Sequence, residues 1–313
     1  MAERKGGAVR TGTLRNAGLI VLKAAVSGLL LTYVFRKAGL QNVIAHLREM
    51  DLRLFGLSSL VYLLLLYLAA VRWSILLGGE QPVRRIYSLT LIGAFFNNLL
   101  PGAIGGDAVK AYYLYKEAGQ GGRIIASVFM DRYVGYAALL CIGLVSGIAA
   151  FRDLATVRMQ WLTPLLFLAF LAGSLAVFGL RIGRRFASIA DFYEYFHETI
   201  RDRLLLAKTF LLSLGVQVLS IFMVYLIARG IGHQPTFAAL FVFVPIIVTA
   251  MMVPLSISGL GIREGAFVLL FGLTGIPAEA STTISFLWFL SIAAASLLGL
   301  VEYVRQRRRP PAA

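Results

Sequence analysis

Two ionisable residues follow a break in an otherwise apolar stretch, "NNLLPGAIGGDAVKAY" at 97–112. Asp107 and Lys110 lie one helical turn apart, directly after Gly105 and Gly106. A helix that begins near Asp107 would offer free backbone N–H groups to an anion, with the Lys110 ammonium beside them. Two other interpretations stay open: an i,i+3 ion pair of small energy, and a helix N-cap formed by Asp107.

Further charged residues stand within apolar segments. Arg263 and Glu264 follow a second break, "PLSISGLGIREG". Asp131 and Arg132 lie near the start of an apolar run, where snorkelling to the membrane interface is an alternative to a functional role. Arg72 stands near the end of another run, and an interfacial anchor explains it equally well. Because an ionised group at the centre of a membrane costs about 2.5–3.5 kcal/mol or more, we expect specific roles for these residues.

The basic residues of these motifs are predicted to form one cluster with fewer acids nearby. The expected ligand is anionic, with phosphate as its charged group, because arginine can bind phosphate through two parallel hydrogen bonds. Asp107 and Glu264 could orient the bases or carry protons. Asn97 and Asn98 can donate and accept hydrogen bonds, either to a ligand or to the broken backbone. The candidate substrate-binding residues are Arg72, Asn97, Asn98, Gly105, Gly106, Asp107, Lys110, Asp131, Arg132, Arg263 and Glu264.

The sequence contains no recognisable metal or cofactor motif. Cys141 is the only cysteine, and the three histidines, His46, His197 and His233, are scattered. A disulfide within the chain is therefore excluded, and we expect no cofactor, no metal and no catalytic residue. The net charge of +15 would suit nucleic acid. In a polytopic chain it is more typical of cytoplasmic loops near anionic lipid, so we expect no nucleic-acid partner.

The composition is that of a membrane protein. Hydrophobic residues make up 59% of the 313 positions and charged residues 14%, against about half and about a quarter in soluble domains. We predict an all-α polytopic membrane protein whose basic N-terminus is an uncleaved start rather than a removed signal peptide. Six segments are long enough to cross a core of about 30 Å. They are Ala17–Phe35, Leu54–Val71, Ile124–Phe151, Trp161–Leu180, Leu204–Ala228 and Ala280–Val304.

Two more apolar segments, Ile86–Lys116 and Pro235–Leu273, contain Pro/Gly breaks and are predicted to be re-entrant hairpins. In the first, the arms Ile86–Leu99 and Asp107–Lys116 would reach only about 21 and about 15 Å as helices. Neither arm would cross a core of about 30 Å. In the second, Thr236–Val253 could cross alone, so a spanning alternative stays open there.

The distribution of basic residues predicts the orientation. With a cytoplasmic N-terminus and six single crossings, the cytoplasmic segments hold eighteen Lys and Arg residues and the opposite side holds seven. Such a bias is typical of cytoplasmic loops. We therefore expect a multi-pass protein of the cell (plasma or inner) membrane with both termini in the cytoplasm.

The two halves of the chain, 1–152 and 153–313, show the same order of span, span, broken hairpin and span. Pro101 and Pro254 stand 153 positions apart and each precedes a Gly-rich, charged motif. Because each half would cross the membrane three times, the second half is expected to be inverted relative to the first. Inverted repeats with interrupted segments at matching positions indicate a transporter whose site lies near the middle of the membrane.

The segment 191–203, "DFYEYFHETIRDR", is the most polar part of the interior of the sequence. Phe192, Tyr195, Phe196 and Thr199 have helical spacing. This pattern fits an amphipathic helix at the membrane surface, and a cytoplasmic loop helix packed on the bundle fits it equally well.

Three separated motifs, "NNLLPGAIGGDAVKAY", "ASVFMDRYVGY" and "PLSISGLGIREGAF", resemble the lysylphosphatidylglycerol synthase transmembrane region, or flippase-like domain family. The resemblance covers nearly the whole chain. Lys110 stands where the family more often has Arg, and Asp131 where it more often has Glu. In full-length members this region translocates aminoacylated phosphatidylglycerol that a soluble C-terminal domain makes. Because the chain stops at Ala313, the resemblance implies only the lipid-handling part.

These observations predict a lipid transporter, not an enzyme, that moves an anionic, aminoacylated or polyprenyl-phosphate lipid between leaflets. The expected partners are membrane lipids, with a separate synthase or a second copy of the chain as further candidates. One alternative is a membrane scaffold for a separately encoded lipid-modifying synthase. Another is an integral-membrane transferase acting on lipid phosphates through Asp107, Asp131 and Glu264.

Overall fold

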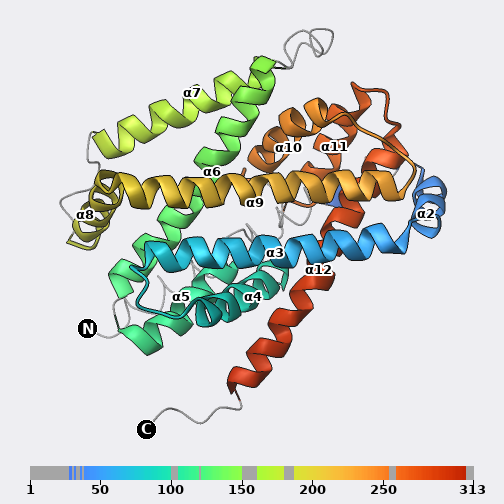
Figure 1. Cartoon of the computed structure of the whole chain (residues 1–313). Coiled ribbons are helices and arrows are strands. Elements are labelled where there is room, and N and C mark those ends of the chain that lie inside the picture. Colours follow the sequence, from blue (N-terminus) through green and yellow to red (C-terminus); the bar gives the residue numbers. More distant parts are fainter. Residues whose placement is uncertain are drawn as a thin grey trace, which may run out of the picture.

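Every regular element in the described part of the chain is a helix (Figure 1). The computed structural model describes residues 28, 29, 32, 36, 39–99, 105–119, 121–149, 161–179, 187–253 and 259–307. Its helices are α2 (Leu40–Arg48), α3 (Leu52–Leu76), α4 (Val83–Leu99), α5 (Gly105–Ala118), α6 (Gly121–Ala149), α7 (Leu162–Ser174) with the π-helix η2 (Leu175–Gly179), α8 (Ala187–Arg201), α9 (Arg203–Gly230), α10 (Phe237–Met251), α11 (Ile262–Gly272) and α12 (Ala278–Arg307).

Five long apolar segments, α3, α6, α7 with η2, α9 and α12, can cross a membrane by their length and composition. They coincide with five of the six predicted spans, so the all-α, multi-pass membrane architecture is confirmed. The remaining predicted span, Ala17–Phe35, lies almost entirely outside the described residues. Aspartate starts two of the long helices: the Asp51 carboxylate accepts from the Arg53 N–H and the Asp202 carboxylate from the N–H groups of the first turn of α9. An N-cap carboxylate satisfies donors that lack a partner within the helix.

The two broken segments form helical hairpins. The first hairpin consists of α4 and α5, with 17 and 14 residues, and the second of α10 and α11, with 15 and 11. At about 1.5 Å per residue, each of these helices is shorter than a membrane core of about 30 Å. The arms of the first hairpin are longer than predicted, because α4 begins at Val83 and α5 ends at Ala118.

The ends of the helices gather at two opposite faces. At one face α8 lies against the end of α3, where the Tyr195 hydroxyl donates to the Leu76 carbonyl at 2.7 Å. The first hairpin opens there, since Arg85 in the first turn of α4 pairs with Glu117 in the last turn of α5. We call this side the α8 face.

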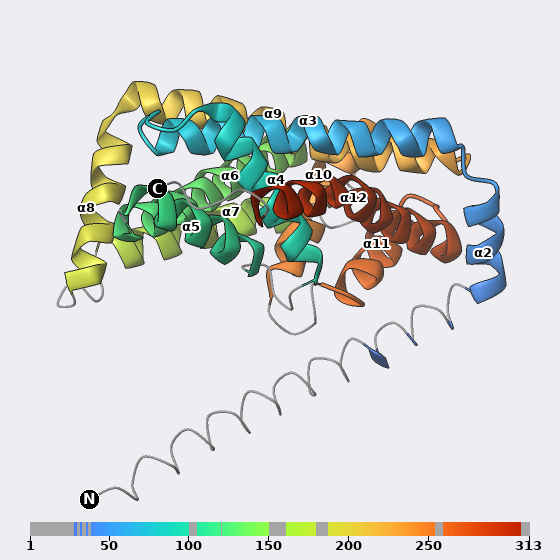
Figure 2. The same cartoon turned by 90° about the horizontal axis from the view of Figure 1, so that it is seen from below.

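At the other side, the α2 face, Met50, Ile231 and Ile276 share one hydrophobic cluster. These residues stand before α3, after α9 and before α12. The second hairpin follows α9 and precedes α12, so it opens at the α2 face. Figure 2 shows α2 and α8 at opposite ends of the antiparallel pair formed by α3 and α9.

The order of elements from α2 to α6 recurs from α8 to α12. The packing shows the same correspondence, because the last helix of each half packs against elements of the other half. Helices α4 and α2 pack on α12, and α10 and α8 pack on α6. Glycine permits the crossings of the first hairpin and α12, since a Cβ on Gly299 would lie 2.0 Å from the Leu91 carbonyl oxygen. These features agree with two inverted repeats. The full layout and the boundary at 152/153 stay predictions, because the first predicted span is not described.

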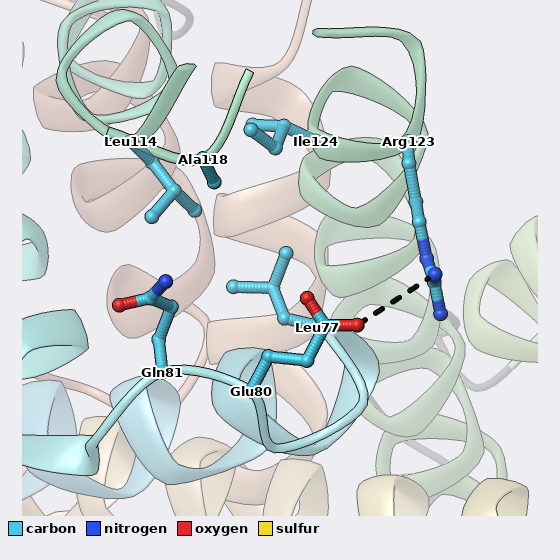
Figure 3. A pocket seen from close by; sticks show the side chains of 7 residues that line it. All are labelled: Leu77, Glu80, Gln81, Leu114, Ala118, Arg123 and Ile124. Carbon is cyan, nitrogen blue, oxygen red and sulfur yellow. Dashed lines mark ion pairs between the residues drawn. The ribbon is translucent and has the colours of Figure 1, made fainter. Parts of the chain in front are cut away.

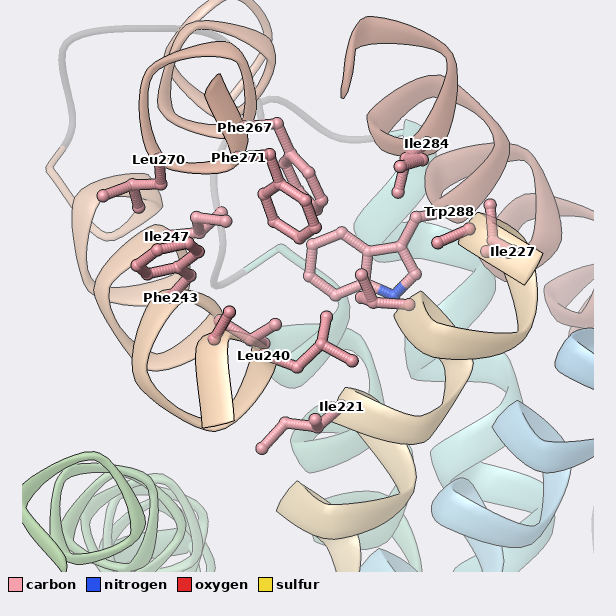
Figure 4. Packing of buried hydrophobic residues seen from close by; sticks show 14 of the residues in the cluster. Ile221, Ile227, Leu240, Phe243, Ile247, Phe267, Leu270, Phe271, Ile284 and Trp288 are labelled. Atoms are coloured by element: carbon pink, nitrogen blue, oxygen red, sulfur yellow. The ribbon is translucent and has the colours of Figure 1, made fainter. Parts of the chain in front are cut away.

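Aromatic and aliphatic side chains hold the second hairpin in the bundle. Figure 4 shows Phe267 and Phe271 of α11 beside Trp288 of α12.

Helix α8 begins at Ala187, four residues before the predicted polar segment. Its Tyr195 and Phe196 are buried against α6, so the loop helix packed on the bundle is the arrangement observed.

Candidate functional site

The break between α4 and α5 is closed by one asparagine and two glycines. The Gly106 N–H donates to the Asn97 side-chain oxygen at 2.8 Å. A Cβ on Gly106 would lie 1.8 Å from the Gly93 carbonyl oxygen, so the two arms cross backbone to backbone. Asn98 donates to the Ala94 carbonyl at 3.3 Å and to the Ser296 hydroxyl at 2.8 Å. Asn97 thus satisfies a backbone N–H in the first turn of α5, and Asn98 joins α4 to α12.

Asp107 does not cap α5, contrary to one of the two structural alternatives. The helix already begins at Gly105, two residues before Asp107, so Asp107 lies within its first turn. Its buried carboxylate accepts from Arg132 Nε at 2.7 Å and lies 3.1 Å from Lys110 Nζ. The predicted i,i+3 ion pair is therefore present, but it is buried and shared with a third charge. Such a pair is costly to break, unlike an exposed one.

A second ion pair lies on the neighbouring helices. Arg72 Nε donates to the Asp131 carboxylate at 2.7 Å, and Arg72 Nη1 donates to the Ser213 hydroxyl at 2.8 Å. Arg72 and Asp131 are each only 5% exposed, which excludes interface anchoring and snorkelling for them. Gly135 leaves room for the guanidinium, because a Cβ there would lie 3.0 Å from Arg72 Nη1.

The two ion pairs belong to one charged layer between α3, α5, α6 and α9. Lys110 Nζ lies 4.5 Å from the ring centroid of Trp73, the residue next to Arg72. The Trp73 indole N–H donates to the Ser127 hydroxyl of α6 at 3.0 Å. The layer holds three cations and two carboxylates, and hence one excess positive charge. The residues of the charged layer are Arg72, Trp73, Asp107, Lys110, Ser127, Asp131, Arg132 and Ser213.

Arg132 differs from the rest of this layer because its side chain is 53% exposed. It hydrogen-bonds through Nε to Asp107. Within the described residues its two terminal nitrogens form no hydrogen bond. A guanidinium in this arrangement can donate parallel hydrogen bonds to two oxygens of a phosphate. Arg132 is therefore the member of the charged layer that an incoming anion can reach.

Arg263 and Glu264 form a separate buried cluster in the second hairpin. Each is 3% exposed, and Arg263 Nη2 lies 2.5 Å from a Glu264 oxygen. The second Glu264 oxygen accepts from the Gly261 N–H at 2.6 Å and so caps α11. Arg263 Nε also donates to Ser285 at 3.0 Å, and its guanidinium lies 4.9 Å from the Phe289 ring.

The expectation of one basic cluster is wrong, because Arg263 lies apart from the other three bases. The acids are fewer than the bases, as expected: three carboxylates, those of Asp107, Asp131 and Glu264, pair with the four bases. In the described part of the chain, no ion pair or hydrogen bond joins Arg263 to the charged layer. Sequence reasoning had missed Trp73, Ser127, Ser213 and Ser285, since hydroxyl and indole groups within apolar spans carry no spacing signal.

The motifs that surround these residues match a known family. A model of the lysylphosphatidylglycerol synthase TM region matches residues 20–299. The chain belongs to this family. It is 25% identical to a UPF0104 membrane protein of Methanothermobacter thermautotrophicus over 92% of this chain and 93% of that one. A UPF0104 membrane protein of Pyrococcus horikoshii is 34% identical over 30% of each chain.

One small pocket lies away from the charged layer of this lysylphosphatidylglycerol synthase TM-region protein, near the α8 face (Figure 3). Its volume is about 20 Å³, enough for roughly one water molecule, and an ion pair of Glu80 and Arg123 at 3.9 Å borders it. The lining residues are Leu77, Glu80, Gln81, Leu114, Ala118, Arg123 and Ile124. The described residues contain no group of three or more His, Cys, Asp or Glu side chains placed for a metal.

Proposed function

We propose that this protein moves an anionic, aminoacylated or polyprenyl-phosphate lipid between the leaflets of the cell membrane. The observation that carries the proposal is the charged layer, which places five ionised groups among membrane-spanning helices and leaves Arg132 half-exposed. Charges at this depth are costly and mark the pathways of substrates. If these groups served only to stabilise the fold, apolar side chains would do so without the free-energy cost of desolvating charges.

The arrangement suits reversible binding of a headgroup. Asp107 holds Arg132 through a single nitrogen, and a lipid phosphate could take the remaining donors or replace Asp107. Because Lys110 also pairs with Asp107, the carboxylate would keep a partner when Arg132 turns to the headgroup. The excess positive charge of the layer favours an anion over a neutral ligand.

The two hairpins support transport over simple binding. They open at opposite faces, and their helical arms pack on the membrane-spanning helices α6 and α12. Alternating access in transporters with inverted repeats proceeds by movement of such elements around a central site. A lipid headgroup would cross the membrane core along the hairpins while its acyl chains stay in the bilayer.

The proposal is tested with purified protein in liposomes that carry fluorescent phosphatidylglycerol, an aminoacylated phosphatidylglycerol or a polyprenyl phosphate. Arg132→Gln should weaken headgroup binding by about ten- to a hundredfold, because hydrogen bonds to charged groups contribute about 1.5–3 kcal/mol. Arg132→Lys should keep part of the activity, since lysine retains the charge without the planar fork.

Arg53→Gln is the matched control, because Arg53 is an exposed arginine in the first turn of α3, at the α2 face. It should leave leaflet exchange unchanged. If the unaltered protein exchanges none of the three lipid classes, the transport proposal is wrong. If it exchanges one of them and Arg132→Gln exchanges it equally fast, Arg132 is not part of the site.

A further inference from the structure

The C-terminal turns of α12 lie across the open end of the first hairpin and join both of its arms. A chain of hydrogen bonds runs from Glu117 of α5 to Glu302 of α12. Arg85 of α4 donates to Glu117 at 3.0 Å through Nε and to the Gln306 side-chain oxygen at 3.3 Å through Nη2. The Gln306 amide donates to the Ser88 hydroxyl at 3.0 Å, which donates to Glu302 at 2.7 Å.

Aromatic contacts join α12 to both arms further along the hairpin, since Phe96 stands in the last turn of α4. The Tyr303 ring of α12 meets Phe96 of α4 edge-on at 5.2 Å and Tyr113 of α5 at 6.4 Å. The Arg307 guanidinium lies 5.0 Å from the Tyr303 ring. Edge-to-face contacts of this kind add to the stabilisation from burial. One side chain of α12 therefore contacts both arms of the hairpin.

A close helix crossing fixes the position of these turns. Gly299 lies one turn before Tyr303, and a Cβ at Gly299 would lie 2.0 Å from the Leu91 carbonyl oxygen. At this crossing α12 and α4 are in backbone contact and cannot slide apart without losing it. The polar and aromatic contacts beyond it involve side chains alone, so they can be lost without disturbing the backbone contact at Gly299.

The second hairpin has no matching device in the described part of the chain. The helix in the equivalent place is α6, which packs on α10. Its last eight residues, Ile142–Ala149, include no charged side chain, and Val145 and Ile148 among them are exposed. Among the described residues, the two open ends of an otherwise repeated architecture thus differ in the contacts that close them.

We propose that Glu302, Tyr303 and Gln306 form a latch that holds the arms of the first hairpin closed at the α8 face. The latch thereby favours the conformation of the protein that is closed at this face. In a repeated architecture without such contacts, the states closed at either face would be nearly equal in free energy. A ligand or partner shifts such an equilibrium only by its differential affinity for the two states. The inference depends on these contacts and not on which lipid is carried.

Hydrogen–deuterium exchange of the full chain in nanodiscs tests the latch. In Gln306→Ala, backbone amides of α4 and α5 should exchange about five- to tenfold faster, because α12 loses its hydrogen bonds to Arg85 and Ser88 of α4, and Arg85 in turn pairs with Glu117 of α5. Ser88→Ala removes only a hydroxyl, and with it the contacts to Glu302 and Gln306, so it should act in the same direction. Amides of α11 should exchange as in the unaltered protein.

Arg53→Ala is the control, because Arg53 is an exposed arginine in the first turn of α3, at the α2 face and away from the latch. Unchanged exchange in α5 of both latch variants would overturn the proposal, as would an equal rise in α5 and α11, which would indicate general destabilisation. Since amide exchange reports the opening of the hairpin and not leaflet transport, faster exchange with no leaflet transport would keep the latch and refute the transport function.

Discussion

At the scale of single residues, the sequence neighbours Asp131 and Arg132 have different environments and different partners. Asp131 is buried and neutralises Arg72, whereas Arg132, the next residue, is half-exposed and shares Asp107 with Lys110. Successive residues on a helix point about 100° apart, so one can serve the interior and the other a cavity or surface. The charged layer therefore combines a buried structural pair with an accessible cation.

The Arg72–Asp131 pair predicts a large loss of stability when one partner is neutralised. Asp131→Asn should lower the free energy of unfolding by about 3–5 kcal/mol, because it leaves the Arg72 charge buried without a counter-ion. Thermal unfolding of the purified variants in detergent measures this loss.

The double variant Arg72→Gln with Asp131→Asn should recover part of that loss, since both charges are then removed. As a control, Arg305→Gln breaks an exposed pair and should cost no more than about 1 kcal/mol. An Asp131→Asn protein as stable as the unaltered chain would show that this pair is hydrated rather than buried.

At the scale of elements, the first hairpin depends on the contact of two backbones. Gly93 of α4 and Gly106 of α5 meet so closely that a side chain at Gly106 has no space. Asn97 of one arm then supplies the acceptor for the first turn of the other. The hairpin is thus a preformed unit that can support the charged residues of α5.

This crossing predicts opposite effects for alanine at two helical glycines. Gly106→Ala should destabilise the protein by about 1–3 kcal/mol or more, because overpacking forces the arms apart. Gly265→Ala in α11 has nothing within 4 Å of the added Cβ. It should be neutral or stabilise by up to about 1 kcal/mol, since alanine is the better helix former.

Melting temperatures of the two variants measured side by side distinguish the mechanisms. Equal melting temperatures for Gly106→Ala and the unaltered protein would mean that α4 and α5 can separate at no cost, and the hairpin would then not be a rigid unit.

At the scale of the whole molecule, the two hairpins open at opposite faces of the bundle. Single cysteines at Glu80 and Lys116, in a Cys141→Ser background, should therefore react with an impermeant maleimide from one side of the membrane. Cysteines at Gln234 and Thr274 should react from the other side. These four residues are exposed and stand at the ends of the hairpins or in the adjoining turns.

Inside-out and right-side-out vesicles provide the comparison for each position. If Lys116 and Thr274 react from the same side, the second hairpin crosses the membrane and the inverted layout is wrong. The predicted basic bias additionally requires Glu80 and Lys116 to lie on the cytoplasmic side, which the same vesicles determine.

Sequence alone predicted the membrane class, the five described spans, the two broken segments and the family. These properties depend on local hydropathy, on helix length and on glycine or proline at particular positions. They can therefore be recognised in each segment without knowing which helix packs against it. The residues of the charged layer were also recognisable, because an ionised group within an apolar run is conspicuous at any position.

Which of these residues pair with one another could be established only from the fold. Arg72 pairs with Asp131, 59 positions away, and with Ser213, 141 positions away, whereas Arg263 pairs with its own neighbour Glu264. Such partners depend on how each helix is rotated and where it crosses the next. Those rotations are set by contacts such as that of Gly93 with Gly106, which involve the backbones of two separate helices and leave no periodic signal in either one.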